Sequence, residues 1–383
     1  MATIKLLLKT TMYTFFISTV VLLSYLICSQ ILGGGTIFGE TLVNTHIQNA
    51  EVGGDPSGIL QLAMTTDTNE ALPVIKHIRK HRGNKTRYPL TLSSPYVINS
   101  PNLCKNATNL VYITIVHTAT THFKRRRIIR KTWANKSLFR NISTRIVFVF
   151  GLTKDIKIQA LLENEQVIHG DIIQGDFLDH YHNLTHKGVL ALRWVSEYCN
   201  HSKVIVKVDD DIFMNPFLLL QNILPKYENK KRFILCRARR PGTTFIFRGN
   251  LQKWSVHKDE FKGYSNYPHQ DCMGFFVIIS ADIIESLYHS AYLAPFFWID
   301  DIYLFGILPS KIGNVTHTDI RDTFTDITYG KQCYTNPQSC NAMVIMAYNL
   351  EETEEIWINI MKHLTNEQKA MVNEDYLLKV HSR

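Results

Sequence analysis

The sequence has no internal repeat and no low-complexity tract, so we expect no repeat architecture. It also lacks zinc-finger spacing and RNA-binding signatures, although its formal charge of +9 and pI near 9.1 would suit a nucleic-acid partner. The densest basic run, residues 124–131, has a single aromatic neighbour, Phe123. We therefore expect no nucleic-acid partner, and we assign part of these charges to a solvent-exposed helix face.

Acidic residues are absent from the start of the chain, where the first is Glu40. Residues 10–32 carry no charge of either sign, and these 23 residues are long and apolar enough to cross a bilayer of about 30 Å. Two lysines precede them, and the positive-inside rule keeps such a terminus in the cytosol. We expect a cytoplasmic tail over residues 1–9 and a transmembrane signal-anchor over residues 10–32. A cleaved signal peptide is the alternative, because small residues follow at 33–35.

The region after the predicted anchor, residues 33–103, lacks sustained periodicity and contains glycine clusters, which is typical of a stem. We expect one folded, lumenal domain over residues 104–383. Seven glycosylation sequons support a lumenal location, at Asn84, Asn106, Asn135, Asn141, Asn183, Asn200 and Asn314. Six cysteines lie outside the predicted anchor, at Cys104, Cys199, Cys236, Cys272, Cys333 and Cys340. This even number is compatible with three disulfides in any of fifteen connectivities.

Strand-like and helix-like segments alternate along the predicted domain, and this alternation predicts an α/β fold with a parallel sheet. We expect strands at residues 110–116, 144–150, 203–208, 233–236 and 275–279. We expect helices at residues 125–133, 156–165, 176–199 and 351–364, with a further helix from residue 281. The longest of these, at 176–199, repeats apolar residues at three- and four-residue steps and so has one buried face.

Three consecutive aspartates, Asp209, Asp210 and Asp211, follow the predicted strand at 203–208. Because side chains alternate along a strand, we expect Asp209 and Asp211 to share one face and Asp210 to point away. Two carboxylates at the end of a parallel strand suit Mg²⁺ or Mn²⁺ carrying a diphosphate. An acidic turn is the alternative. A calcium EF-hand loop is excluded, because Phe213 occupies the fifth ligand position and no glycine follows.

Five segments match motifs that occur together in known proteins. They are Arg127-Ile-Ile-Arg130-Lys-Thr132-Trp133 for RxxIRxTW, Asp171-Ile-Ile with Asp176 to Lys187 for DII…DFxDxYxNLTxK, Lys207 to Asn215 for KxDDDxFxN, Tyr267 to Ser280 for YPxYCSGxGYxxS, and Ile299 to Tyr303 for (I/E)DDVYxG. Together they resemble the β1,3-galactosyltransferases and β1,3-N-acetylglucosaminyltransferases of the Golgi. Each motif alone is weak, but five in family order and spacing are specific.

The resemblance implies a Rossmann-like GT-A glycosyltransferase domain with an open, mostly parallel sheet. It also implies inverting transfer of a hexose from a UDP-sugar to the 3-hydroxyl of an acceptor glycan on a glycoprotein or glycolipid. UDP-galactose is favoured over UDP-N-acetylglucosamine as the donor, with Mn²⁺ or Mg²⁺ as the metal. The implied location is the Golgi membrane, with a single-pass type II orientation.

Roles for five carboxylates follow from the same resemblance. Asp209 and Asp211 are expected to hold the metal and, together with Asp210, to bind the donor. Asp301 matches the position of the general base that activates the acceptor hydroxyl, with Asp300 beside it. A helix N-cap with an acidic first turn is the alternative for this pair.

The resemblance also implies roles for two arginines, and the sequence differs from the family pattern at three positions. Arg127 and Arg130 are expected on the nucleotide side, with a structural ion pair as the alternative for each. Met273 and Phe276 replace a serine and a glycine of the fourth motif, so we expect a bulkier acceptor-side loop.

Met346 falls where many family members carry a metal-binding histidine, and a thioether is a poor ligand for Mn²⁺. His317 or a water is the expected substitute. A catalytically impaired pseudoenzyme or glycan-binding module of the same fold is therefore the alternative function.

Disulfide pairing has two local arguments. Cys104 and Cys199 each precede a strand, and in doubly wound sheets of this type those strands are neighbours, so a bridge between them is geometrically possible. Cys333 and Cys340 enclose a short loop and can pair locally. This would leave Cys236 with Cys272.

Overall fold

The computed structural model describes residues 92–249, 253–335 and 340–381. All described residues belong to one compact unit, which lies within Thr66–Arg383. The predicted tail, the predicted anchor and the predicted stem up to residue 91 lie outside the described residues. No helix within the described ranges is both long and apolar enough to cross a membrane.

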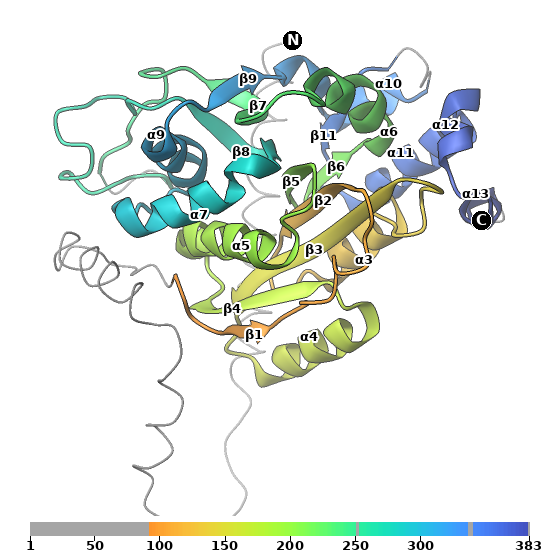
Figure 1. The fold of residues 1–383 in the computed structure, drawn as a ribbon, viewed down its shortest axis with the longest axis horizontal. Coiled ribbons are helices and arrows are strands. Elements are labelled where there is room, and N and C mark those ends of the chain that lie inside the picture. Colours follow the sequence, from red (N-terminus) through yellow and green to blue (C-terminus); the bar gives the residue numbers. More distant parts are fainter. Residues whose placement is uncertain (1–91, 250–252, 336–339, 382–383) are drawn as a thin grey trace, which may run out of the picture. The chain divides into compact units, whose positions relative to one another are not determined.

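An eight-stranded sheet forms the centre of the described unit (Figure 1). Its strands, in order across the sheet, are β1 (Tyr96–Ile98), β4 (Ile172–Leu178), β3 (Ser143–Leu152), β2 (Leu110–His117), β5 (Val204–Asp209), β8 (Asp271–Ser280), β7 (Phe233–Arg239) and β9 (Thr316–Asp319). The run β4-β3-β2-β5 is parallel, as the sequence predicts. However, β8 is antiparallel to both β5 and β7, so the sheet is mixed and the expected parallel order holds mainly in its first half.

A smaller sheet and several helices surround the main sheet. The small sheet has the order β10 (Phe324–Asp326), β11 (Val344–Met346) and β6 (Ile212–Met214). The helices are α3 (Phe123–Lys131), α4 (Ile156–His169), α5 (Leu184–Tyr198), α6 (Pro216–Leu218), α7 (Ile284–Leu293), α8 (Asp300–Ile302), α9 (Leu308–Ile312), α10 (Ile327–Cys333), α11 (Leu350–Lys362), α12 (Asn366–Met371) and α13 (Glu374–His381). A π-helical turn, Tyr303–Ile307, joins α8 to α9.

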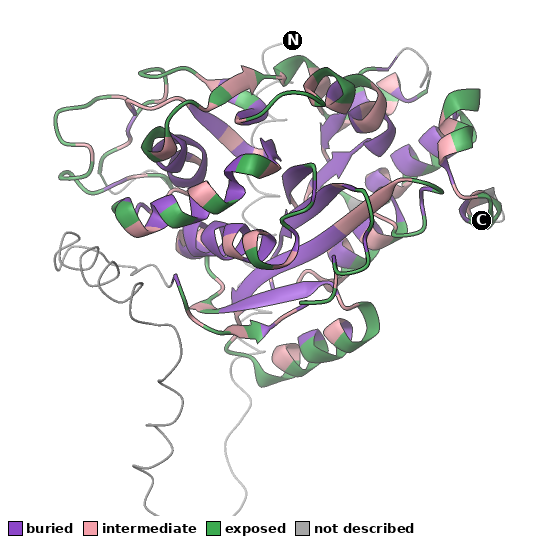
Figure 2. Ribbon diagram, viewed as in Figure 1, coloured by how far each residue is buried: buried purple, intermediate pink, exposed green. Residues whose placement is uncertain are grey.

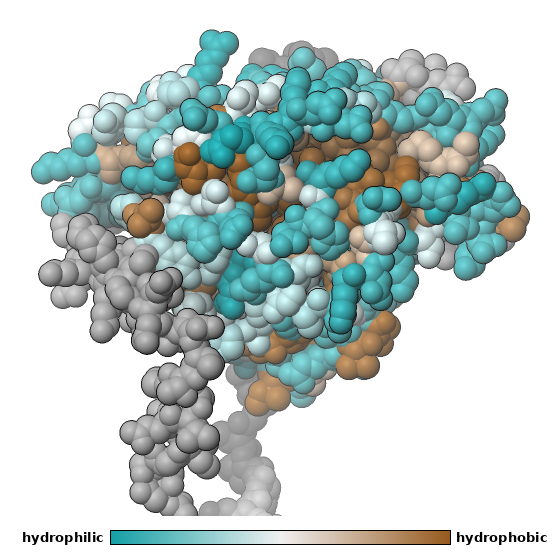
Figure 3. Space-filling view, viewed as in Figure 1, coloured by the Kyte–Doolittle hydropathy of each residue, from teal (hydrophilic) through white to brown (hydrophobic). Residues whose placement is uncertain are grey.

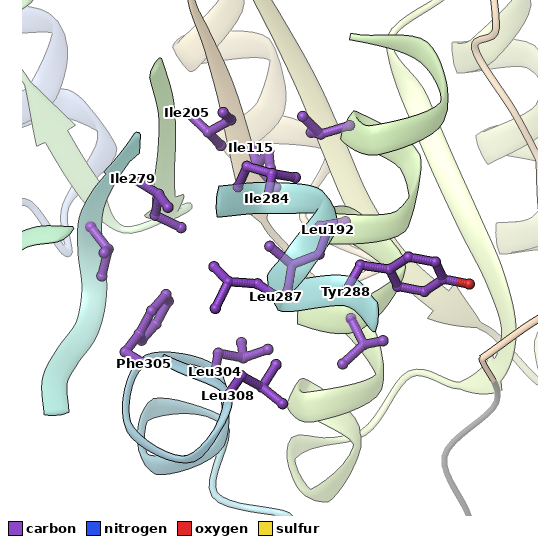
Figure 4. Packing of buried hydrophobic residues seen from close by; sticks show 14 of the residues in the cluster. Ile115, Leu192, Ile205, Ile279, Ile284, Leu287, Tyr288, Leu304, Phe305 and Leu308 are labelled. Carbon is purple, nitrogen blue, oxygen red and sulfur yellow. The ribbon is translucent and has the colours of Figure 1, made fainter. Parts of the chain in front are cut away.

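The central strands of the main sheet are buried between two hydrophobic layers, and Figure 2 shows β2, β5 and β8 as mostly buried. The edge strand β9 has no buried residue. On one face, α5, α7 and the 303–312 segment pack against β2, β5 and β8 (Figure 4). On the other face, α3, α4, α11 and the small sheet form the second layer. Figure 3 shows apolar surface near the middle of the viewed face and again at its lower edge, with hydrophilic surface between them.

Local sequence explains where individual elements begin and end. The β-branched residues of β2 favour a strand that is buried on both sides. The side chain of Asp155 caps α4 by accepting hydrogen bonds from the backbone of Lys157 and Ile158. The helix ends at Gly170, whose φ of 66° lies in the left-handed region that glycine adopts without strain.

The predicted helix at 176–199 is wrong in its first part. Residues up to Leu178 belong to β4, because Leu178 pairs with Leu152 of β3. A 3₁₀ turn at Tyr181–Asn183 follows, and α5 starts only at Leu184. Sheet pairing is a long-range interaction, so the helical spacing of apolar residues did not reveal it.

The predicted stem also ends too late. β1 lies inside the predicted stem, yet it pairs with β4 as an edge strand of the main sheet, and Leu92 is buried in the hydrophobic layer around α5. A strand of three residues is too short to produce a periodic pattern. The folded domain therefore includes Leu92 and begins before the expected position, residue 104.

All three expected disulfides are confirmed. Cys104 pairs with Cys199, Cys236 with Cys272, and Cys333 with Cys340. The first bridge lies where neighbouring β2 and β5 begin, as the strand-order argument predicts. The second joins β7 to β8.

Candidate active site

A cleft of about 450 Å³ opens at the carboxyl ends of β2 and β5, beside the first residues of β8. Its lining includes His117, Thr118, His122, Asp179, Tyr181, Lys187, Asp209, Asp210, Asp211, Trp254, Met273, Gly274, Asp300 and Asp301. The fold thus brings the aspartate triplet and the Asp300–Asp301 pair to one site. The triplet follows the end of the parallel strand β5, and α/β sheets bind ligands at that edge.

The three consecutive aspartates have different surroundings. Asp210 is mostly buried and accepts hydrogen bonds from Thr118 at 2.5 Å and from Arg125 at 3.3 Å, with His122 Nδ1 at 2.7 Å. Burial would raise the pKa of Asp210, but these partners outweigh burial and lower it. Asp209 and Asp211 are 39% and 34% exposed. The expected alternation does not continue through the triplet, because β5 ends at Asp209 and all three aspartates line the cleft.

A buried lysine connects the triplet to β8. Lys207 Nζ donates hydrogen bonds to Asp209 Oδ1 at 2.6 Å and to the Gly274 carbonyl at 2.5 Å. Burial alone would lower the pKa of Lys207, but the charges of Asp209, Asp300 and Asp301 raise it above its ordinary value. Lys207 therefore stays cationic and holds two walls of the cleft together.

Asp300 and Asp301 form the first turn of α8, opposite the triplet. A Cβ at Gly274 would lie 1.9 Å from Asp301 Oδ1, so only glycine permits this close approach. Burial raises the pKa of both carboxyls, and the charge of Asp301 raises that of Asp300 further. Arg239 Nη2 lies 3.8 Å from Asp301 Oδ2 and opposes the rise at Asp301. A carboxyl with a raised pKa is a stronger base than an ordinary aspartate.

His117 ends β2 inside the cleft and is only 5% exposed. Neither ring nitrogen has a hydrogen-bond partner among the described residues. Burial, together with the charges of Lys207 and Lys187, lowers the pKa of His117 well below its ordinary value. The imidazole is therefore neutral and keeps one donor and one acceptor available to a ligand.

Aromatic side chains form the outer wall. Trp254 is 46% exposed, and its Nε1 donates a hydrogen bond to the Tyr181 hydroxyl at 2.8 Å. Lys253 Nζ lies 3.9 Å from the centre of the Tyr181 ring. Half-exposed aromatic faces beside a polar cleft are suited to contacts with a sugar ring or a base.

Comparison with known proteins identifies the family of the chain. The family model described as galactosyltransferase matches residues 124–329. Mouse β1,3-galactosyltransferase 1 is 31% identical over 293 residues, which cover 74% of this chain and 84% of that protein. The chain belongs to the galactosyltransferase family.

Other relatives are similar at lower identity. β1,3-Galactosyltransferase 2 of Pongo abelii is 29% identical over 286 residues, which cover 72% of this chain and 62% of that protein. A solved structure of the galactosyltransferase LgtC, in complex with donor and acceptor sugar analogues, covers 67% of this chain and 99% of its own at 10% identity and a TM-score of 0.31. The family assignment rests on the sequence matches, and as a galactosyltransferase-family member the protein is a hexosyltransferase.

The arginines of the first galactosyltransferase motif lie away from the cleft. Arg130 forms ion pairs with Glu165 at 2.6 Å and with Asp171 at 2.7 Å, which favours the structural alternative over a nucleotide contact. Arg127 is exposed on α3 and is not in the cleft wall. In RxxIRxTW the first arginine stands four residues before the second, so the motif begins at Arg126. That residue is fully buried and pairs with Glu165.

The departures from the family pattern have different consequences. Met273 lines the cleft, as expected, but Phe276 is fully buried and packs against Phe324 in the second hydrophobic layer. The expectation that Phe276 enlarges the acceptor loop is therefore wrong, because Phe276 pairs with Val208 of β5 and its side chain packs into the core.

Met346 and His317, the two residues expected near the metal, lie in different places relative to the aspartate triplet. Met346 ends β11, and the next residue, Ala347, donates a backbone hydrogen bond to the Asp211 carbonyl, so the C-terminal segment does approach the triplet. His317 lies on β9, where its Nε2 is 2.8 Å from the Phe305 carbonyl. It is outside the cleft wall, so His317 is not a substitute for the family histidine.

Two carboxylates are the donor set that this structure offers to a divalent metal. Within the part of the chain described, no group of three or more His, Cys, Asp or Glu side chains is arranged as a complete metal site. Burial, followed by the charges of Asp209 and Asp210, raises the pKa of Asp211, so a cation would relieve this repulsion. Asp209 and Asp211 therefore fit Mg²⁺ or Mn²⁺ as a partial ligand set that diphosphate and water oxygens complete.

Several cleft residues were not predicted to act. Lys187 and Lys207 stand inside the quoted motifs, so spacing was an available signal for both. His117 and Trp254 stand outside those motifs. Only the packing of the folded chain shows that they line the cleft.

Proposed function

We propose that the protein transfers galactose, with inversion, from UDP-galactose to the 3-hydroxyl of an acceptor glycan on a glycoprotein or glycolipid. UDP-N-acetylglucosamine is the second donor to test. The proposed location is the Golgi membrane, with the described domain in the lumen and residues 10–32 as the anchor. The family match and the names of the relatives support the sugar and the linkage.

One observation carries the proposal: Asp209 and Asp211 face the same cleft as Asp301. Inverting transfer needs charge compensation at the leaving diphosphate and a base at the attacking hydroxyl. The triplet provides the first function and Asp301 the second. Lys207 fixes the two parts relative to each other through Asp209 and the Gly274 carbonyl.

The residues divide the chemistry as follows. Asp301 accepts the proton of the acceptor hydroxyl while that oxygen attacks the anomeric carbon on the face opposite UDP. Arg239 stabilises the ionised form of Asp301. Asp209 and Asp211 would hold a divalent ion, which would supply charge compensation to the diphosphate.

The test is sugar transfer by the full-length chain with UDP-galactose or UDP-N-acetylglucosamine and added Mn²⁺. We expect Asp209→Asn and Asp211→Asn each to lower kcat by roughly a hundredfold, the scale of losing one electrostatic stabiliser. Asp211→Asn should leave the unfolding midpoint unchanged, because the side chain is partly exposed and Arg125 lies 4.0 Å away. Asp209→Asn should lower the midpoint, because it removes the charge opposite the buried Lys207.

Asp210→Asn is the matched control at the neighbouring position. It weakens the contacts with Thr118, His122 and Arg125, so we expect a loss of about 1–3 kcal/mol in the free energy of unfolding. Equal kinetic defects in all three variants would contradict the division of roles. UDP binding without transfer to any acceptor would favour the pseudoenzyme.

A further inference from the structure

A second cavity, of about 720 Å³, adjoins the active-site cleft. Its lining includes Arg237, Arg239, Arg240, Thr243, Thr244, Gln270, Met273, His317, Asp319 and Arg321. Met273 lines both spaces, so the cavity begins where the cleft ends. We call this cavity the arginine pocket.

The pairing of β7 with β8 places the arginine side chains on the face of the sheet from which Arg239 approaches Asp301, the proposed base. Arg237 pairs with Met273, and Arg239 with Asp271, in the β7–β8 ladder. Side chains of paired residues two positions apart stand on one face of a sheet. From this face Arg239 forms an ion pair with Asp271 and also approaches Asp301.

The arginine pocket has an excess of positive charge. Arg239 is paired with Asp271, and Arg321 with Asp319. Arg237 and Arg240 are exposed, and neither guanidinium has an ion pair or hydrogen bond with another residue in the described part of the chain. Two guanidinium groups are therefore available to an external anion.

We propose that the arginine pocket binds an anionic group of the acceptor glycan, either a carboxylate or a sulfate ester. This proposal rests on the proposed function, because it places the acceptor beside Asp301. A guanidinium matches both anions through paired N–H donors, and the volume accommodates a substituted sugar ring. The donor is bound on the other side of Met273, at the triplet, so the arginine pocket is free for the acceptor.

Binding is measured first, because it does not depend on turnover. The full-length chain is titrated with methyl β-galactoside and its 6-sulfate, and with methyl β-glucoside and methyl β-glucuronide. The two pairs distinguish a sulfate site from a carboxylate site. We expect the anionic member of one pair at least to bind about tenfold more tightly than its neutral partner, a preference that falls with added salt.

The variant Arg237→Gln/Arg240→Gln should remove that preference and leave binding of the neutral sugars unchanged. Lys157→Gln is the control for removal of an exposed cation, because Lys157 lies on α4, beside the opposite edge of the sheet. Its anion preference should equal that of the wild type. In transfer assays, the double variant should raise KM for the anionic acceptor about tenfold and leave KM for UDP-galactose unchanged.

Three results would overturn the proposal: equal wild-type binding of both members in each pair, an anion preference that survives in the double variant, or a raised KM for UDP-galactose in place of the acceptor. The last result would assign the arginines to the donor diphosphate. If the wild-type protein transfers sugar from neither donor but still binds the anionic sugars more tightly, the proposed function is refuted and the anion site is retained.

Discussion

Some polar side-chain atoms in the cleft are buried without a hydrogen-bond partner among the described residues, and a ligand that pairs with them would recover the free energy this costs. His117 is the clearest case, because both of its nitrogens are buried and lack protein partners within the described residues. An unpaired buried polar group costs free energy, and such groups are rare in native proteins. His117 ends β2 and lines the same cleft as the aspartate triplet, so we propose that donor binding relieves this cost.

Replacement of His117 should therefore make the protein more stable and at the same time weaken its binding of the UDP-sugar. We expect His117→Leu to raise the free energy of unfolding by about 1–3 kcal/mol, since it removes the unpaired polar atoms. The same variant should raise KM for the UDP-sugar, because the ligand loses a hydrogen-bonding partner. Urea unfolding and steady-state kinetics measure the two effects.

The exposed His289 on α7 provides the control: His289→Leu should leave the KM unchanged. A destabilised His117→Leu protein with normal kinetics would instead give His117 a structural role.

The proposed base makes a second prediction, for pH dependence. Burial raises the pKa of Asp301, and only the deprotonated carboxylate accepts a proton. Activity should thus rise with pH through this raised pKa, and half-maximal kcat should fall above the ordinary aspartate value of about 4. The profile is measured from acid to neutral pH, with circular dichroism to confirm folding. Half-maximal kcat at or below the ordinary aspartate value would argue against Asp301, whereas Asp301→Asn should remove transfer throughout.

Among secondary-structure elements, the sequence predicted the strands that carry the site better than the boundaries around them. β2, β3 and β5 are buried on both faces, so their apolar runs identify them without tertiary information. β1 and the last residues of β4 are defined by pairing with distant segments, which no local pattern encodes. The same limit applies within the cleft, where the motifs indicated Asp209 and not His117.

α5 packs closely against the π-helical turn Tyr303–Ile307, and the contact depends on a glycine at residue 188. A Cβ at Gly188 would lie 2.2 Å from Leu304 Cδ1, and Leu304 is buried. Alanine is favoured over glycine in a helix by about 1 kcal/mol, but overpacking a core costs about 1–3 kcal/mol. We therefore expect Gly188→Ala to destabilise the protein in urea unfolding.

A double-mutant cycle tests the cause. Leu304→Ala should be less harmful in the Gly188→Ala background than in the wild type, because the two substitutions share one space. Additive effects would show that the loss arises elsewhere.

At the scale of the whole molecule, the disulfides differ in the length of chain that they close. Cys104 and Cys199 are 95 residues apart, whereas Cys333 and Cys340 are seven apart. In the chain-entropy description, the longer loop contributes about 4–5 kcal/mol and the shorter about 2–3 kcal/mol. We expect Cys104→Ala/Cys199→Ala to lower the free energy of unfolding more than Cys333→Ala/Cys340→Ala. Equal losses would show that loop length does not control the effect.

The mixed order of the main sheet has a consequence for how this enzyme diverges from its relatives. The parallel strands end at His117 and Asp209, while the antiparallel strands β7 and β8 carry Arg239 and Met273. The two sets of side chains thus belong to separate stretches of the polypeptide. We therefore expect a chimera of this protein that carries residues 233–280 of another family member to take that relative's acceptor preference. Its preference for the nucleotide sugar should remain that of this protein.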